Sequence, residues 1–564
     1  MNTIHLEILS YHRLILVLLL VVLLFTFSAK PMVGMFRYFF TRQSSLSSFL
    51  LALYLVAVLY CVGIIPIHTS YPAFGYLLAG IFIVFFPHFF AHQGIKNPHK
   101  FVEGATSFKL LGPKGQMLPI NAPELGLFLV GTPGCGKTKY IIEPALFKMI
   151  GKGYSGILYD YDFSDAHGKN YSLSQLAYNC CLNTTGGNTK FVSINFQNLS
   201  ASSRINPISP RYIDDRKKLS NCLKTFLLNL NPHLSQKEDF WHKNTYALLK
   251  SLVVFLANRH PQYCSLPHVI MFGLQPAKLL MTMLCADEEA KLYASPVLDA
   301  LENSKEQFAG VMANFKVSLE RLLDPAIFWV LSGDDVPHII NDPQNPYVVC
   351  LGNTPTEKEV LSPVLAMAIS VLVSNMYSHD RNKSFLMLDE LPTLFLPNLN
   401  EVPATARKYN IATIVALQTI AQLEKTYGVL GARELQETFG NHLIGRSPFR
   451  LSKELSDMFG KQESKEVSKT ISATHHASKT THKKEKAIVS PQVIMSLKVG
   501  EFVGQVAETG RGFFKMQLQP IGSYDQQLQY KHFKPLPEVY AQVDVAESFA
   551  RIQKETTHLV GQYD

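Results

Sequence analysis

A short apolar run that leads directly into a glycine-rich loop constrains the fold of this chain more than any other feature. Residues 127–138 read LFLVGTPGCGKT, a buried-strand pattern followed by the spacing G-x-x-x-x-G-K-[ST]. In such a loop the glycines allow a tight turn that aims backbone N–H groups inward, the lysine reaches the β- and γ-phosphates, and the final hydroxyl ligates Mg²⁺. A chance match is the alternative, but the apolar strand before the loop and the helical sequence after it favour a cradle for a nucleoside triphosphate.

We expect the whole loop to contact the nucleotide. Its eight residues are Gly131, Thr132, Pro133, Gly134, Cys135, Gly136, Lys137 and Thr138. Among them, Lys137 is the expected catalytic cation and Thr138 the expected ligand of the nucleotide-bound Mg²⁺.

A second apolar strand ends in two acidic residues. Residues 384–390 read SFLMLDE, which places Asp389 and Glu390 directly after four apolar residues. In an ATPase, the first carboxylate holds the water shell of Mg²⁺ and the second polarises the attacking water. An acidic pair that only caps a strand before a turn is the alternative. Beside an intact phosphate loop, the pair predicts the second half of a hydrolytic site.

Two further polar residues flank the predicted strand 411–417. Gln418 ends this strand, which we expect beside the Asp389 strand, so that its amide would contact the γ-phosphate or the lytic water. Arg407 lies on the preceding helix and is a candidate arginine finger for the site of a neighbouring subunit. An ordinary polar residue at a strand end and a surface arginine remain the alternatives for the two positions.

The first 95 residues contain three long apolar blocks, at 12–28, 46–66 and 73–90. Each approaches the roughly 20 residues that a membrane-spanning helix needs. A cleavable secretory signal is the alternative for the first block, but the two blocks that follow favour a retained anchor. The sequence therefore predicts a membrane anchor with about three helices.

Charged residues around these blocks predict their orientation. The loop between the first two blocks carries three cationic residues and no acid, the loop 67–72 carries neither Lys nor Arg, and Lys96 and Lys100 follow the third block. Positive charge accumulates on the cytoplasmic side of a membrane. We therefore expect a multi-pass protein with residues 29–45 and everything after 91 in the cytoplasm.

Composition narrows the classes of partner and compartment. A chain of 564 residues is too long for one hydrophobic core. Its 53 basic and 44 acidic residues give a net charge of +9, which favours an anionic partner such as nucleic acid or a membrane surface without deciding between them. The eight cysteines form no C-x-x-C pair, which argues against a zinc site or a disulfide framework and indicates a reducing compartment.

Beyond residue 100, short apolar strands alternate with helical segments, which predicts an α/β domain with a parallel sheet. Between 212 and 340 the strand signal fades and apolar residues recur at helical spacing, which predicts an inserted all-α domain. The nucleotide-binding domain is then split into 100–211 and 341–530. A tail of unclear order, 531–564, completes the chain.

One polar tract interrupts the second part of that domain. Residues 461–486 are rich in Lys, Ser and Thr and show no apolar period, so we interpret them as an exposed, flexible basic loop. His475, His476 and His482 in this tract would be metal ligands in another context. They lack further ligands nearby, and we interpret them as solvated residues.

Together these features resemble the type IV coupling proteins of conjugation and type IV secretion, the TraG/TraD group, whose ATPase domain belongs with the FtsK-like and RecA-like motors. The resemblance covers most of residues 100–520. It is carried by the phosphate loop with the IIEP sequence ending at Pro144, Asn206-Pro207-Ile208, Phe240-Trp241, the LDEL sequence ending at Leu391, Arg407, Ile411, Gln418, Gln422, Tyr427-Gly428, Gly440-Asn441 and the segment 488–500.

The resemblance implies a homo-hexamer at the bacterial inner membrane, with ATP and Mg²⁺ in a RecA-like domain that faces the cytoplasm. In this family the all-α domain engages the relaxosome, and single-stranded DNA with its bound relaxase is delivered to components of the type IV secretion channel. It implies roles in ATP hydrolysis for six residues of this chain. These are Lys137, Thr138, Asp389, Glu390, Arg407 and Gln418.

Two departures from the family pattern stand out. The usual Asp-x-Lys-Gly-Glu after the second strand is replaced here by DYDFSD at 160–165, which leaves the role of that loop open. The family more often has two membrane helices around a small periplasmic domain, whereas the external loop here is confined to residues 67–72.

Three functions compete at this point. The leading hypothesis is an ATP-driven pump for single-stranded DNA during conjugative transfer or mobilisation. The alternative is a nucleotide-dependent receptor or adaptor for protein secretion that does not pump DNA. An assembly ATPase for pilus biogenesis is the third, against which the long hydrophobic anchor argues only modestly.

Overall fold

The structure is a computed structural model that describes residues 101–563 apart from 165–170, 184–187, 214, 233–239, 472–476, 510–512, 526–527 and 529–531. For 464–471 and 477–484 it describes the backbone alone. The apolar blocks predicted to cross the membrane, at 12–28, 46–66 and 73–90, lie outside the described residues. No helix within the described part of the chain is long and apolar enough to span a membrane.

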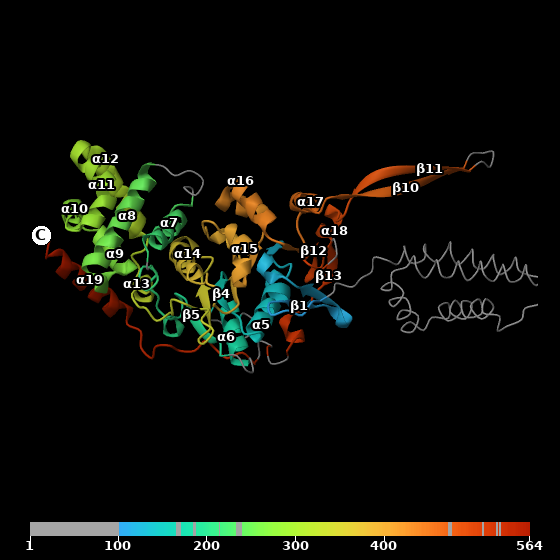
Figure 1. The fold of residues 1–564 in the computed structure, drawn as a ribbon, viewed down its shortest axis with the longest axis horizontal. Helices are drawn as coiled ribbons and strands as arrows, with labels where there is room; N and C mark the ends of the chain where they lie inside the picture. Colours follow the sequence, from blue (N-terminus) through green and yellow to red (C-terminus); the bar gives the residue numbers. More distant parts are fainter. Residues whose placement is uncertain are drawn as a thin grey trace, which may run out of the picture. The chain divides into compact units, whose positions relative to one another are not determined.

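Among the described residues, nine strands form one mixed sheet with the order β13-β12-β9-β3-β8-β7-β4-β6-β5 (Figure 1). Seven strands are parallel: β3 (Leu127–Val130), β4 (Ser155–Asp160), β5 (Lys190–Ile194), β6 (Tyr347–Gly352), β7 (Ser384–Leu388), β8 (Ile411–Leu417) and β9 (Asn441–Ile444). The α/β fold is therefore confirmed. The sheet is not wholly parallel, however, because β12 (Glu501–Gln505) and β13 (Phe514–Gln517) extend it in antiparallel fashion.

The parallel strands are apolar because both faces of the sheet are covered. Along β3, Leu127 and Leu129 pack into one core, and Phe128 and Val130 pack into the other. The first core is closed by β1 (Phe108–Leu111), β2 (Met117–Ile120), α5 (Glu143–Gly151) and α6 (Leu173–Asn183). The second is closed by α7 (Arg216–Leu230), α14 (Lys358–Ser374), α15 (Glu401–Ala406) and α16 (Ile420–Thr438).

Between β5 and β6, the described residues form helices and no strand of the sheet. After α7 these are α8 (Phe240–Arg259), α9 (Leu266–Gly273), α10 (Ala277–Cys285), α11 (Glu288–Asn303), α12 (Lys305–Glu320) and α13 (Pro325–Leu331). Several begin at a polar residue whose side chain accepts hydrogen bonds from the first-turn N–H groups, as Asp287, Ser304 and Asp324 do. Helix α7 packs against α14, so it covers the sheet, whereas α8 packs mainly with α11 and also contacts α7, α12 and α9.

The basic tract that we predicted as an exposed loop is instead a two-stranded antiparallel ribbon. Strand β10 (Lys461–Ile471) pairs with β11 (Ala477–Ala487) along its whole length. The ribbon follows α17 (Phe449–Met458) and precedes α18 (Pro491–Met495). The two strands are held together by backbone hydrogen bonds, which do not depend on apolar side chains. The sequence of the tract therefore lacks the alternation of apolar and polar residues that usually indicates a strand. His475 and His476 lie outside the described residues.

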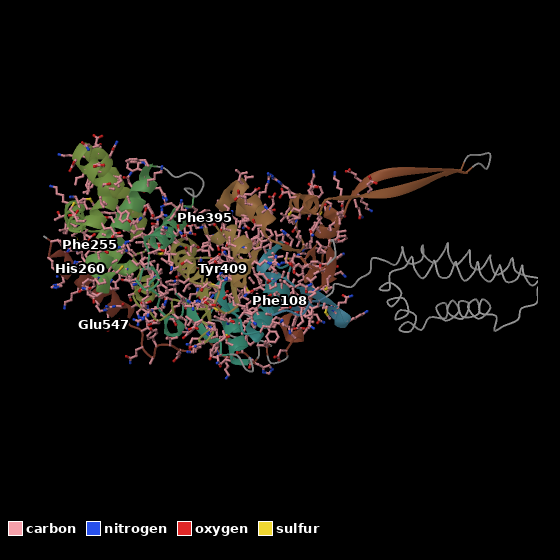
Figure 2. All side chains as sticks on the ribbon, viewed as in Figure 1. Phe108, Phe255, His260, Phe395, Tyr409 and Glu547 are labelled. Carbon is pink, nitrogen blue, oxygen red and sulfur yellow. The ribbon has the colours of Figure 1, made fainter. Side chains whose placement is uncertain are left out.

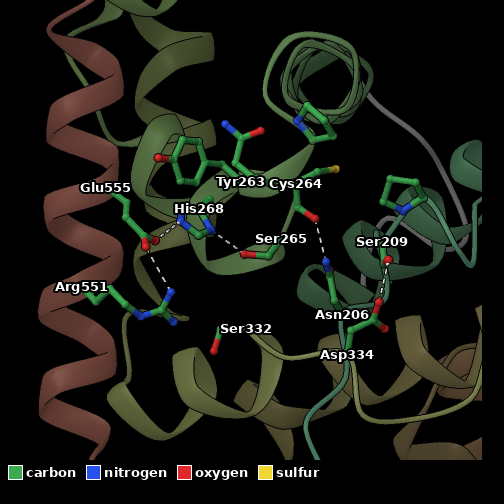
Figure 3. Close-up of a pocket in the computed structure, with 13 residues that line it drawn as sticks. Asn206, Ser209, Tyr263, Cys264, Ser265, His268, Ser332, Asp334, Arg551 and Glu555 are labelled. Carbon is green, nitrogen blue, oxygen red and sulfur yellow. Dashed lines mark hydrogen bonds and ion pairs between the residues drawn. The ribbon is translucent and has the colours of Figure 1, made fainter.

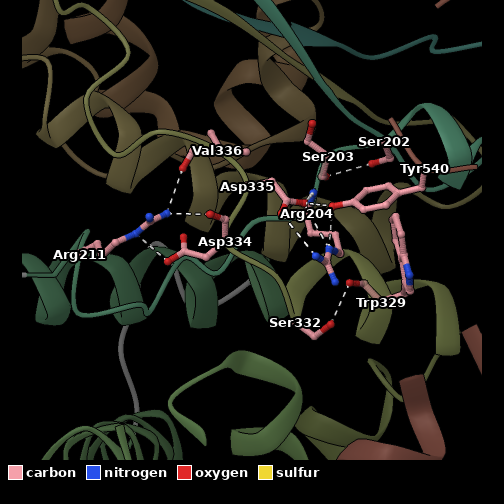
Figure 4. A network of polar contacts seen from close by, with 10 residues as sticks. All are labelled: Ser202, Ser203, Arg204, Arg211, Trp329, Ser332, Asp334, Asp335, Val336 and Tyr540. Atoms are coloured by element: carbon pink, nitrogen blue, oxygen red, sulfur yellow. Dashed lines mark hydrogen bonds and ion pairs between the residues drawn. The ribbon is translucent and has the colours of Figure 1, made fainter. Parts of the chain in front are cut away.

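The C-terminal segment, whose order could not be inferred from its sequence, connects the sheet to the helices. Lys534 donates its backbone N–H to the Asn179 side chain on α6 at 2.9 Å. Tyr540 packs edge-on against Trp329 and contacts Arg204 and Asp335 (Figure 4). Helix α19 (Val545–Val560) then packs against α9 and α13.

Contacts at the end of the chain fix α19 on the helical region. Tyr563 hydrogen-bonds His260 at 2.9 Å and packs against the Phe255 ring. Phe255 and His260 lie in the helical region (Figure 2). Glu555 meets His268 at 3.0 Å beside a cavity of about 430 Å³ (Figure 3). Neither the phosphate loop nor the Asp389-Glu390 pair contributes to the lining of this cavity, so we assign it to the packing of α19.

Candidate nucleotide site

The carboxyl edge of the sheet brings the predicted residues together. Val130, the last residue of β3, lies opposite Leu417 at the end of β8, and Leu388 at the end of β7 lies opposite Val415. Parallel strands end at the same edge, and ligands of open α/β sheets bind there. The phosphate loop after β3, Asp389 after β7 and Gln418 after β8 therefore converge.

The phosphate loop adopts a backbone that requires glycine at two positions. Gly134 has φ 73° and Gly136 has φ 100°, both in the left-handed region that side chains disfavour. A Cβ at Gly136 would also lie 2.7 Å from the Tyr140 ring. Space around Gly134 is open: apart from its chain neighbours, no described atom lies within 4 Å of the position that a Cβ would take. A ligand can therefore approach the backbone closely there.

Neighbouring segments hold this loop from three sides. The N–H of Gly131 donates to the Leu417 carbonyl at 3.3 Å, and the N–H of Thr132 donates to the Arg446 carbonyl at 2.9 Å. On the other side, the Gly500 N–H donates to the Cys135 carbonyl at 2.9 Å. The loop is thus preorganised by β8, by the turn after β9 and by the turn before β12.

The helix that follows the loop starts with an unusual turn. Thr138–Ile142 form a π-helical segment, and α5 begins at Glu143 with Pro144 in its first turn. Proline has no N–H to donate to the preceding turn, which explains the wider start. Thr138 is both the last residue of the phosphate loop and the first residue of this segment.

Lys137 is the buried cation of the site. Its side chain is only 8% exposed, and its Nζ donates to the Gly131 carbonyl at 2.6 Å. It lies close enough to the acidic residues after β7 to lower the pKa of both Asp389 and Glu390. A buried cation of this kind is stable only beside compensating negative charge.

The acidic groups outnumber that lysine. Burial raises the pKa of Asp389 to about 7, and the nearby carboxylates of Asp160 and Glu390 contribute to the rise, against the effect of Lys137. Burial also raises the pKa of Asp160 to about 6, although its Oδ2 accepts two hydrogen bonds from Ser174, both 2.8 Å long. Converging carboxylates with one lysine form an oxygen-rich donor set that suits Mg²⁺.

Glu390 has a strained backbone. Its φ of 64° and ψ of 59° place it in the left-handed region, which is unfavourable for a residue with a Cβ. The Thr393 hydroxyl donates to its carbonyl at 2.8 Å and helps to fix this turn. Burial raises the pKa of the Glu390 carboxyl, while Lys137 and hydrogen bonds from the side chain and backbone of Gln418 lower it. Gln418 therefore contacts the Glu390 carboxylate through both its side chain and its backbone.

Arg407 lies at the opposite edge of the sheet. It begins a short 3-10 turn, Arg407–Tyr409, immediately before β8, so the length of β8 separates it from Gln418. Seven residues of strand span roughly 20 Å. The exposed Arg407 guanidinium forms an ion pair with Glu508 at 3.0 Å. The structure thus does not bring Arg407 to the nucleotide site of its own chain.

Two contributors to the site were missed from the sequence. The turn after β9 presents the Arg446 carbonyl to both the N–H and the hydroxyl of Thr132. Gly500 braces the loop from the β12 side. The place of Asp160 beside Asp389 was not predicted either. The order of the strands decides these contacts, and no local signal in the sequence reports that order.

Comparisons with known proteins agree with one another, because each matches a coupling protein. The sequence profile of the family described as "Type IV secretion-system coupling protein DNA-binding domain" matches residues 215–508, which is more than half of the chain. The coupling protein TraD of Escherichia coli (strain K12) is 32% identical over 111 residues. This aligned stretch covers 19% of the present chain and only 15% of TraD.

Solved structures share the fold at low sequence identity. The unbound conjugative coupling protein TrwBdeltaN70 is 17% identical, with a TM-score of 0.57 over 74% of this chain and 89% of that one. The plasmid coupling protein TrwB in complex with ADP and Mg²⁺ is 16% identical, with a TM-score of 0.57 over 80% of this chain and 93% of that one. These similarities extend over most of both chains.

Proposed function

Because this chain belongs to the family of type IV secretion-system coupling proteins, we propose that it is a membrane-anchored ATPase that pumps single-stranded DNA with its bound relaxase to a type IV secretion channel. The match to the family profile confirms the resemblance seen in the sequence. The convergence of the phosphate loop, Asp389-Glu390 and Gln418 at one sheet edge is the observation that carries the ATPase activity.

The site suits ATP and Mg²⁺. The backbone N–H groups of residues 131–138 and the Lys137 ammonium would hold the phosphates, and the Thr138 hydroxyl and Asp389 would hold the metal. Mg²⁺ bridging the phosphates would neutralise the charge that develops during hydrolysis. TrwB has been observed with ADP and Mg²⁺, which supports this assignment.

The chain itself contributes a base and its orienting group. Glu390 would take the proton of the attacking water, and burial raises its pKa above the ordinary value, which favours this role. Gln418 holds the Glu390 carboxylate in one orientation by hydrogen bonds. Lys137 offsets the negative charge of the cluster. The residues that would carry these roles all lie at the carboxyl edge of the sheet, in the described part of the chain.

Arg407 completes the site of another subunit in this proposal. An arginine at the amino edge of the sheet lies far from its own phosphate loop, yet it is exposed and available to a neighbour. An arginine finger supplied by a partner stabilises the transition-state charge. This arrangement fits a ring of identical subunits, and we propose a homo-hexamer.

The remaining parts of the proposal concern location and cargo. Residues 1–95 would anchor the protein in the bacterial inner membrane in a multi-pass manner, with the ATPase domain in the cytoplasm. The net charge of +9 suits a polyanionic substrate, and the family description names DNA binding.

A nucleotide-dependent receptor for proteins is the second candidate, and one surface feature favours it. Phe240 and Trp241 at the start of α8 are 49% and 40% exposed and stack edge-on against each other. Exposed aromatic side chains are frequent anchors in protein interfaces. This pair would bind a protein substrate whether or not DNA is moved.

ATP turnover of the full-length chain, measured with and without single-stranded DNA, separates the two candidates. We expect DNA to stimulate turnover and Lys137→Ala to lower it by about 100-fold or more, because the phosphates lose their buried cation. The control is Lys139→Ala, which removes an exposed lysine two positions away and should retain most of the activity. Turnover that ignores DNA while nucleotide controls binding of a protein partner would contradict the pump.

A further inference from the structure

The ribbon formed by β10 and β11 carries an excess of positive charge. Its residues 461–487 hold seven lysines and three glutamates, whereas the whole protein has a net charge of only +9. The nucleotide site and the sheet make no use of it. The ribbon projects beyond α17 and α18, away from the sheet (Figure 1).

The register of the ribbon concentrates the lysines. Lys465 pairs with Lys483, and Lys469 pairs with Lys479. Cross-strand partners lie on the same face, and so do positions four residues apart, which are about 13 Å apart along a strand. Five lysine positions, Lys461 among them, therefore share one face with Glu463 and Glu485. The net charge of these positions is +3, and like charges directly opposite one another destabilise a strand pair, so an anionic partner would relieve the repulsion between the paired lysines.

We propose that the basic ribbon, made of strands β10 and β11, holds the sugar-phosphate backbone of duplex DNA. The inference rests on the proposed function, because it assigns a contact to the duplex that would supply the single strand that the ATPase moves. A two-stranded ribbon fits the major groove of B-DNA, which is about 12 Å wide. Lysines along one face would neutralise phosphates without reading bases.

The composition of the ribbon favours duplex over single-stranded DNA. Proteins that hold single strands combine positive charge with aromatic side chains on which bases stack. The ribbon contains no Phe, Tyr or Trp. Duplex DNA also carries the denser phosphate charge, so the release of counterions gives a larger gain for the same number of lysines.

The base of the ribbon is joined to the nucleotide site. Between Arg446, whose carbonyl accepts from Thr132 of the phosphate loop, and Lys461 at the start of β10, the chain forms only α17. Arg450 on α17 is almost fully exposed and forms an ion pair with Glu454 on the same helix at 3.7 Å. DNA held by the ribbon is therefore one helix away from the loop that senses nucleotide.

The test uses the full-length chain with four substitutions, Lys465→Gln, Lys469→Gln, Lys479→Gln and Lys483→Gln. Affinity for a labelled random-sequence duplex is measured by fluorescence anisotropy over a series of salt concentrations. We expect a loss of about tenfold or more, and a slope of log K against log salt that is shallower by about 2 to 4. Single-stranded DNA of the same sequence should lose less affinity than the duplex.

The matched control removes the same charge elsewhere. Lys278→Gln, Lys291→Gln, Lys305→Gln and Lys554→Gln change four exposed lysines on α10, α11, α12 and α19. This control should keep the affinity and slope of the wild type. Equal losses in both variants, a loss confined to single-stranded DNA, or a loss of binding to phosphatidylserine vesicles with duplex binding unchanged would each overturn the proposal.

A second variant with a shortened ribbon gives a test that does not depend on whether the lysine variant folds. Joining Gln462 to Lys486 through Asn-Gly replaces the ribbon by a tight hairpin turn. Basal ATP turnover without DNA should stay at the wild-type level, and duplex affinity should fall as in the lysine variant. If the wild type binds duplex and the shortened chain binds it equally well, the ribbon proposal fails alone. If the wild type binds no DNA, the proposed function fails with it.

Discussion

Charged side chains are largely buried at the carboxyl edge of the central sheet and exposed at its amino edge. At the carboxyl edge, Lys137 and Glu390 are buried beside the partly exposed Asp389, and loss of solvation raises the pKa of both carboxyls. At the amino edge, Arg407 and Glu508 form an ion pair in which both side chains are about half exposed. Buried charges cannot be separated from their partners without a large cost, whereas an exposed pair contributes at most about 1 kcal/mol.

This difference indicates what each edge can do. The carboxyl edge brings charged residues of one chain into a fixed arrangement. The amino edge offers an arginine that is easily released to another molecule, because its partner Glu508 holds it only weakly. A ring of subunits would bring the amino edge of one chain to the carboxyl edge of the next. The following substitutions test this contrast, beginning with the largest expected effect.

Arg407→Ala should lower ATP turnover by about 1,000-fold, since a finger supplied to a nucleotide site is worth this much or more. The loss should be seen in turnover of the assembled protein, with binding of a fluorescent ADP analogue nearly unchanged. Lys408→Ala is the control, because it removes the neighbouring exposed cation. Equal losses for the two variants would mean that the amino edge contributes only general positive charge.

Glu390→Gln should lower turnover by about 100-fold or more, because the amide cannot take a proton from the attacking water. Its volume and its hydrogen bonds are nearly those of the acid, so the nucleotide should still bind. The measurement is single-turnover hydrolysis together with nucleotide binding. Retention of wild-type turnover would remove Glu390 from the mechanism and leave Asp389 as the group to examine.

Glu508→Gln should have the smallest effect. The exposed ion pair with Arg407 contributes little, so the free energy of unfolding should change by less than about 1 kcal/mol. Turnover should stay at or slightly above the wild-type value, because Arg407 is released. Chemical denaturation and ATPase assays check both values. A loss of turnover as large as that of Arg407→Ala would show that the pair itself is required.

Much of the carboxyl edge could be predicted because its signals are local. The phosphate loop and the Asp389-Glu390 pair each follow an apolar strand, and parallel strands end at one edge. The left-handed backbone of Glu390 could not be predicted, since it depends on tertiary contacts such as that with Thr393. The contacts of Arg446 and Gly500 depend on β9 and β12, whose places in the sheet have no local signature.

Other parts of the fold were hidden for different reasons. The ribbon of β10 and β11 is polar throughout, so the alternation that usually reveals a strand is missing. Helix α19 follows a polar stretch that masks its beginning, and its apolar face is small. The distance of Arg407 from its own site follows from the length of β8 and could be read only once the strands were placed.

Mixing the two inactive variants tests the central claim most directly. In a ring built from equal amounts of Arg407→Ala and Glu390→Gln chains, some sites combine an intact Glu390 with an Arg407 from the neighbour. We expect ATP turnover of the co-assembled protein to rise well above that of either variant alone, towards a fraction of the wild-type rate. Turnover that stays at the sum of the separate variants would contradict a site shared between the amino edge of one subunit and the carboxyl edge of the next.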